Sequence, residues 1–155
     1  MKRTILVLSV LMFALNTNVL AGSDFERMKA LVGEWEATSP EGKSRVTFQL
    51  ISNGTALMET VTNENMVSIY HPDGQALLMT HYCAVGNQPR MRALPLSGGD
   101  AISFQLVDVA NLKGKEGHMQ RLVIKFQDAN HITEEWTWNE NGKETTAVFH
   151  LQRVK

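Results

Sequence analysis

The order of hydrophobic and polar residues changes its period once along this chain. A short stretch repeats apolar residues at helical spacing: Phe25, Met28, Leu31 and Val32. Ser23 and Glu26 have the spacing of a helical capping box, and Gly33 is a typical helix stop. Beyond Gly33 the pattern alternates with a period of two, which indicates β-strands. We therefore expect one short N-terminal helix followed by a series of strands.

The alternating region divides into about ten strands separated by turn residues. The expected strands are 34–39, 43–52, 55–62, 65–71, 75–84, 89–96, 101–108, 117–128, 131–139 and 143–153. Many short sequential strands with one apolar face favour closure, because a closed sheet has no exposed edge. We predict an all-β fold, an up-and-down antiparallel β-barrel with a short N-terminal helix.

The turn Asn141-Gly142 is a strong hairpin signal and is expected to pair Glu140 with Lys143. This register gives the last two strands one apolar face, which holds Ile132, Glu134, Trp136, Trp138, Ala147, Phe149 and Leu151 and ends at Arg153. The opposite face is mostly polar and includes His150.

The turn Pro72-Asp73-Gly74 allows two registers. A three-residue loop places His71 opposite Gln75 and matches apolar with apolar residues, Ile69 with Leu77 and Val67 with Met79. A two-residue loop would mix the two faces, so we expect the longer loop. His81 and Cys83 then continue an inward-facing row.

The first 21 residues have the pattern of a signal peptide. The pair Lys2-Arg3 precedes an apolar run, and Ala21 ends a sequence that suits a signal peptidase. The run is too short to span a bilayer stably, so no membrane span is expected after cleavage. We predict a signal peptide at 1–21, a single barrel domain at 22–155, and a periplasmic or secreted location.

Charge and cysteine content add two expectations. The formal net charge is −1, and the chain has no cluster of basic residues, which argues against a nucleic-acid partner. Cys83 is the only cysteine, so an internal disulfide is excluded. The oligomeric state stays open.

Unusual side chains concentrate in residues 80–92. On one strand face, the Cβ atoms of His81 and Cys83 would lie about 6–7 Å apart, which is long for a direct thiol–imidazole hydrogen bond. The pair could also supply two ligands of a metal such as zinc, with His71 or Glu59 completing the set. Core packing or ligand contact is the third interpretation. No catalytic residue is assigned.

Three charged residues define the ligand hypothesis. Arg90 and Arg92 share one strand face; inward they would form an anion-binding wall, and outward an ordinary charged surface. Glu134 lies among tryptophans, and a buried carboxylate needs a partner. We expect Arg90, Arg92 or His81 to meet it; the alternative is a barrel mouth where Glu134 reaches water.

These residues predict a small-molecule site inside the barrel. The ligand would be apolar or amphipathic and anionic, and the candidate ligand-binding residues are His81, Cys83, Arg90, Arg92, Glu134 and Trp136. Two other classes stay open. One is an enzyme or a haem or metal protein that uses His81, Cys83 or His150. The other is a structural or protein-interaction module whose barrel is filled by side chains.

Several motifs resemble known barrel families. Gly33-Glu34-Trp35 resembles the Gly-x-Trp start of lipocalin-type barrels, the calycin group, in which the tryptophan plugs the closed end and an arginine on the last strand packs across it. Arg153 matches that arginine. The segments 81–83 and 86–92 are similar to a family of secreted bacterial barrel proteins without an established activity. A more distant resemblance to nitrobindin-type haem barrels implies a haem-ligating histidine at the position of His150.

Overall fold

The computed structural model describes residues 21–62, 64–95, 99–114 and 116–154. The signal peptide predicted at 1–21 therefore lies almost wholly outside the described residues. The elements are α1 (Ala21–Lys29), β1 (Gly33–Ser39), β2 (Gly42–Ile51), the 3₁₀ turn η1 (Ser52–Gly54), β3 (Ala56–Val61), β4 (Met66–Asp73), β5 (Ala76–Tyr82), β6 (Gln88–Ala93), β7 (Ala101–Ala110), β8 (His118–Asp128), β9 (His131–Glu140) and β10 (Lys143–Arg153).

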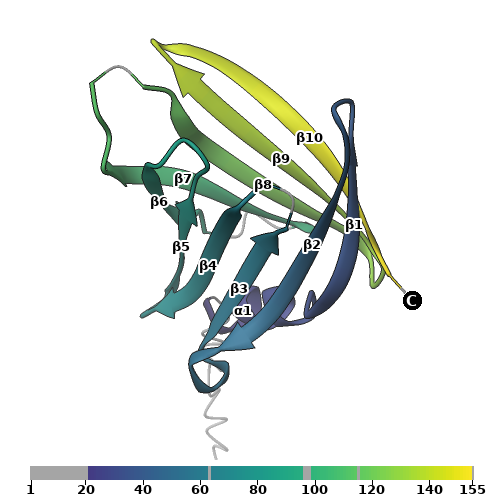
Figure 1. The fold of residues 1–155 in the computed structure, drawn as a ribbon. Helices are drawn as coiled ribbons and strands as arrows, with labels where there is room; N and C mark the ends of the chain where they lie inside the picture. The colour runs from purple at the N-terminus through teal and green to yellow at the C-terminus, as the bar shows by residue number, and fades with distance from the viewer. Residues whose placement is uncertain (1–20, 63, 96–98, 115, 155) are drawn as a thin grey trace, which may run out of the picture.

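The strands form a closed antiparallel barrel in which each strand pairs with its neighbours in sequence (Figure 1). Closure is made by β1 and β10, whose register runs from Trp35 opposite Arg153 to Thr38 opposite His150. Each of the ten strands is hydrogen-bonded to two neighbours, so the sheet closes on itself. The predicted fold class, a lipocalin-like up-and-down barrel with a short N-terminal helix, is confirmed.

Helix α1 lies at the lower end of the barrel in Figure 1. It buries Phe25 and Met28, and Leu31 in the turn that follows is also buried. The predicted helix bounds are shifted: Ser23 lies inside α1 rather than at its N-cap, and α1 ends at Lys29 before two turn residues. No helix among the described residues is long and apolar enough to cross a membrane.

The predicted register of the last hairpin is confirmed. Glu140 pairs with Lys143, and this register continues through Trp136 opposite Ala147 and Glu134 opposite Phe149. His150 pairs with Thr133 on the outer face, where the two side chains lie within hydrogen-bond distance (3.3 Å).

The predicted register of the β4–β5 hairpin is wrong. Asp73 pairs with Ala76, so the loop has two residues, with Gly74 at the first position and a positive φ of 59°. The inner pairs are consequently Ser68 with His81, Tyr70 with Met79, and Pro72 with Leu77. The predicted register places apolar residues of β4 inside, whereas this part of the interior is lined by Ser68, Tyr70 and His81.

The barrel interior is filled at the end covered by α1. Trp35 is fully buried and donates a hydrogen bond from Nε1 to the carbonyl of Leu31 (2.8 Å). The Arg153 guanidinium lies 4.3 Å from the centre of the Trp35 ring and donates to the carbonyls of Val32, Ala30 and Ala129. Gly33 has φ +137°, and a Cβ there would lie 2.8 Å from Arg153 Nη1. The position thus requires glycine.

Candidate functional site

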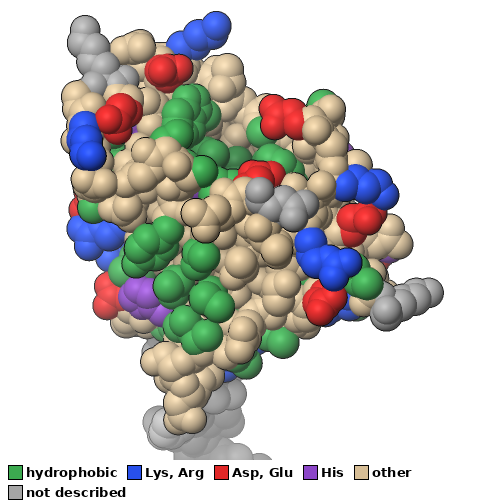
Figure 2. Space-filling view, viewed as in Figure 1, with side chains coloured by type: hydrophobic (Ala, Val, Ile, Leu, Met, Phe, Trp, Pro, Cys, Tyr) green, Lys and Arg blue, Asp and Glu red, His purple; other side chains and the backbone are tan. Residues whose placement is uncertain are grey.

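A cavity of about 300 Å³ occupies the barrel end opposite α1. Its apolar walls come from seven strands and include Val46, Val61, Met66, Met119, Trp136, Phe149 and Leu151. The face shown in Figure 2 has two groups of hydrophobic side chains, an upper one with acidic side chains beside it and a lower one beside a histidine. A volume near 300 Å³ is at the lower limit for small-molecule sites. The cavity therefore suits a small ligand.

The Glu59 carboxylate lies in the cavity wall, and Tyr70 is its hydrogen-bond partner. Glu59 is almost completely buried on β3, in the inward row between Leu57 and Val61. The Tyr70 hydroxyl on β4 donates to Glu59 Oε2 over 2.6 Å. This bond satisfies one carboxylate oxygen, and a hydrogen bond from Ser68 also favours the charged form of Glu59.

Glu134 is the second buried carboxylate of the cavity wall. It projects from β9 with only 3% of its surface exposed. Trp136 Nε1, two residues along the same strand, donates to Glu134 Oε2 over 3.0 Å. The other oxygen, Oε1, is buried and has no hydrogen-bond partner among the described residues. An unpaired buried acceptor costs about 1–3 kcal/mol, so this oxygen is poised for a donor.

His81 and Glu134 both contact the side chain of Trp136. Its imidazole packs against that indole at 4.8 Å between ring centres and an interplanar angle of 45°. Nδ1 is 3.0 Å from Ser68 Oγ, and Nε2 is buried without a partner in the described part of the chain. The predicted inward orientation of His81 is correct, although its cross-strand neighbour is Ser68.

Burial controls the protonation of this group of residues. It raises the pKa of the Glu59 carboxyl from 4.5 to about 7, against the opposing effect of hydrogen bonds from Tyr70 and Ser68. Burial and the nearby Glu59 charge raise the pKa of Glu134 well above its usual value. Burial lowers the pKa of His81 to about 4, so its imidazole is neutral at pH 7. Among the described residues, the cavity lining thus contains two buried acids and no lysine or arginine to balance them.

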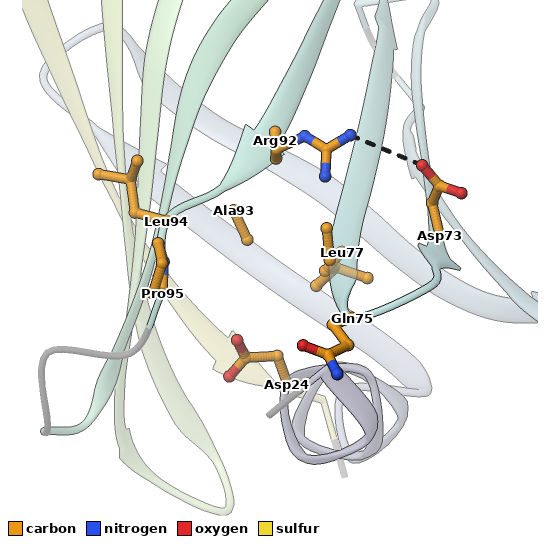
Figure 3. Close-up of a pocket in the computed structure, with 9 residues that line it drawn as sticks. Asp24, Asp73, Gln75, Leu77, Arg92, Ala93, Leu94 and Pro95 are labelled. Carbon is orange, nitrogen blue, oxygen red and sulfur yellow. Dashed lines mark ion pairs between the residues drawn. The ribbon is translucent and has the colours of Figure 1, made fainter. Parts of the chain in front are cut away.

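The two arginines lie on the outside of the barrel, so the outward one of the two orientations considered from the sequence is found, and neither arginine lines the cavity. The Arg90 guanidinium forms a two-pronged ion pair with Asp108 on β7, and 59% of its side chain is exposed. Figure 3 shows the Arg92 guanidinium directed at Asp73, 3.6 Å away. The expectation that an arginine meets Glu134 fails, because Met91 and Pro89 take the inward positions of β6.

Cys83 lines the cavity just beyond the end of β5 and is partly buried. His81 Nδ1 is engaged by Ser68 rather than by this thiol, so the geometry does not support an activated thiolate. In the described ranges, no three His, Cys, Asp or Glu side chains are grouped closely enough to hold a metal ion. His150, the haem-ligand match, faces outward and does not fit a haem inside the barrel.

Sequence reasoning missed two residues of the site and underrated a third. Ser68 and Tyr70 were expected on the outer face, which followed from the wrong hairpin register. Glu59 enters the sequence prediction as a possible metal ligand and as a weaker case of a buried carboxylate than Glu134, because the alternation of its strand is ambiguous. The glycine at the first position of the β4–β5 loop was the available signal, since it suits a two-residue turn.

A second cavity, of about 310 Å³, lies at the end near α1 (Figure 3). Asp24 from the helix, Leu77 and Arg92 from the sheet, and Leu94 just after β6 contribute to its wall. It borders Pro95, after which the next three residues are not described. It lies on the opposite side of the packed core from the Glu59–Glu134 cavity.

Comparison with known proteins gave no relative: no protein-family model and no curated protein matches this sequence.

Proposed function

We propose that this protein is a lipocalin-like binding protein that holds a small, largely apolar molecule inside its barrel. The observation that carries the proposal is the cavity of about 300 Å³ whose wall is mainly apolar and contains two buried polar atoms, Glu134 Oε1 and His81 Nε2, that have no hydrogen-bond partner among the described residues. Pockets of this composition bind ligands by burying an apolar body and orienting it through a few polar groups.

The position of the arginines changes the expected ligand. The anionic ligand inferred from sequence depended on Arg90 and Arg92 facing inward, and both pair with carboxylates outside. The resemblance to secreted calycin-like barrels and the signal-peptide pattern of residues 1–21 support a periplasmic or secreted binding protein. These two points remain part of the proposal.

Native mass spectrometry of the protein purified from its own cells tests the proposal most directly. We expect a bound small molecule that is released on denaturation. As a defined probe, 1-octanol titrated by calorimetry should bind at one site per chain.

Two neighbouring variants on β10 separate the cavity from the outer surface. Ala147 lines the cavity, whereas Val148 faces away from it, opposite Glu135. Ala147→Trp should occupy the cavity mouth and weaken octanol binding by about tenfold or more, since it replaces ligand volume with indole. Val148→Trp should leave binding unchanged. Equal binding by both variants, or no binding by the wild type, would contradict a ligand site inside the barrel.

A further inference from the structure

The charged residues around the cavity all have the same sign. Four charged side chains line it, and all four are glutamates: Glu59 and Glu134 in the wall, and the exposed Glu41 and Glu64 in the β1–β2 and β3–β4 turns. No lysine or arginine is among the described residues of the lining. A concave site lined by one sign of charge raises the local concentration of ions of opposite sign.

The two buried glutamates of the wall, Glu59 and Glu134, are suited to binding a cation. Glu134 exposes only 3% of its surface, and its Oε1 accepts no hydrogen bond in the described structure. Glu59 and Glu134 come from opposite parts of the barrel, β3 and β9, and repel each other across the interior. Buried carboxylates of this kind are stable only when a cation or a proton compensates them.

Aromatic side chains lie next to the Glu134 carboxylate. Trp136 lies beside the Glu134 carboxylate and also lines the cavity, and Phe149 faces Glu134 across the β9–β10 pair. Aromatic faces attract organic ammonium groups, most strongly where water is excluded. The remaining wall, including Val46, Met119 and Leu151, is apolar.

We propose that the ligand of this cavity is a small organic cation, an amine whose protonated nitrogen meets Glu134 and Glu59 while its hydrocarbon part packs against the apolar wall. This inference rests on the proposed function, because it names the ligand class of the same site. The ammonium donates to Glu134 Oε1, and its charge replaces the proton that the carboxyl pair otherwise retains.

Three probes of equal chain length distinguish this inference from the general binding function: octylamine, 1-octanol and octanoate, titrated by calorimetry at pH 8. We expect octylamine to bind at least about tenfold more tightly than octanol, because hydrogen bonds between charged groups are stronger than those between neutral groups. Octanoate should bind least. If octanol or octanoate binds as tightly as octylamine, the cation inference is wrong and the binding function stands. If none of the three binds, both fail.

Substitution of the carboxylate locates the selectivity. Glu134→Gln keeps the shape of the side chain and the bond from Trp136, and it should reduce the preference for octylamine over octanol by about tenfold. The matched control is Glu36→Gln, which removes one negative charge from the outer face of β1, where Glu36 pairs with Lys43. A preference that survives Glu134→Gln and Glu59→Gln alike would overturn the inference.

A measurement on the unchanged protein covers the case in which a variant does not fold. The groups that face Glu134 and Glu59 are Tyr70, His81 and Trp136, besides Ser68. Octylamine stays protonated between pH 5 and 8, whereas the carboxyl pair takes up protons as the pH falls. The preference for octylamine over octanol should therefore shrink toward pH 5, and octylamine binding near pH 7 should release protons. A preference independent of pH would contradict the proposal.

Discussion

The two ends of the barrel interior use buried polar groups in opposite ways. At the α1 end, Trp35 and Arg153 direct their donors at backbone carbonyls, and the indole and guanidinium stack on each other. At the other end, Glu134 Oε1 and His81 Nε2 are buried beside a cavity and have no hydrogen-bond partner in the part of the chain that the structure describes. Satisfied polar groups stabilise a fold, whereas unsatisfied ones lower stability and are available to a ligand. The comparison associates the α1 end with stability and, under the proposed function, the cavity end with ligand binding.

The largest expected effect is at the α1 end. Trp35→Ala should reduce the free energy of unfolding by about 3–5 kcal/mol, because it removes a fully buried indole and leaves a cavity under Arg153. Urea unfolding followed by circular dichroism measures the change. The control is Glu36→Ala at the exposed neighbouring position. It should lower the free energy of unfolding by about 0–1 kcal/mol, the usual range for a surface ion pair. A small loss for Trp35→Ala would show that this end does not hold the barrel together.

A substitution at the cavity end should raise the free energy of unfolding at neutral and alkaline pH, whereas Trp35→Ala lowers it. The pKa of Glu59 is raised to about 7 in the folded protein from 4.5. An acid with a raised pKa favours folding at low pH, and this contribution is lost as the pH rises from about 4.5 through about 7. Glu59→Gln keeps an acceptor for Tyr70 and should be more stable than the wild type at pH 8, by up to about 3 kcal/mol.

The pH series itself checks the origin of that gain. The advantage of Glu59→Gln should shrink between pH 8 and pH 5, where the wild-type carboxyl holds its proton. His81, whose pKa is lowered to about 4, destabilises both proteins as the pH falls from 6.5 and so cancels from the difference. Glu36→Gln, on the outer face, controls for the loss of one charge. An advantage that is constant with pH would mean that carboxylate burial is not its cause.

The smallest effect is expected outside the barrel. Arg92 is half exposed and pairs with Asp73 at 3.6 Å. Arg92→Ala should change the free energy of unfolding by less than about 1 kcal/mol and leave octanol and octylamine affinities unchanged. Calorimetry and urea unfolding of the same sample check both points. A loss of ligand affinity would restore the arginine to the site, contrary to its outward orientation.

Most of the architecture could be predicted from the sequence because local signals agree there. The strand pattern, the Asn141-Gly142 hairpin and the positions of Trp35 and Arg153 all follow from alternation, turn chemistry and a motif resemblance, and the structure agrees with each. Signals of this kind depend on a few neighbouring residues and are strongest where one strand face is apolar.

The candidate site was predicted only in part, because its residues break that pattern. His81, Glu134 and Trp136 were identified and do line the cavity, and so does Cys83. The predicted β4–β5 register is wrong because the inward face of β4 carries Ser68 and Tyr70, while the apolar Val67 and Ile69 face outward. Local rules tend to fail at functional sites, where polar groups are kept inside at a cost in stability.

The sequence by itself determined the strands, the short N-terminal helix and the hairpin at residues 140–143, because backbone turns and side-chain alternation are local properties. Only the tertiary structure decided which polar side chains meet. Glu59 and Glu134 are more than seventy positions apart in the sequence and face each other only because the sheet closes. The same closure turned Arg90 and Arg92 to the outside, where water and the nearby carboxylates of Asp108 and Asp73 accommodate their charge.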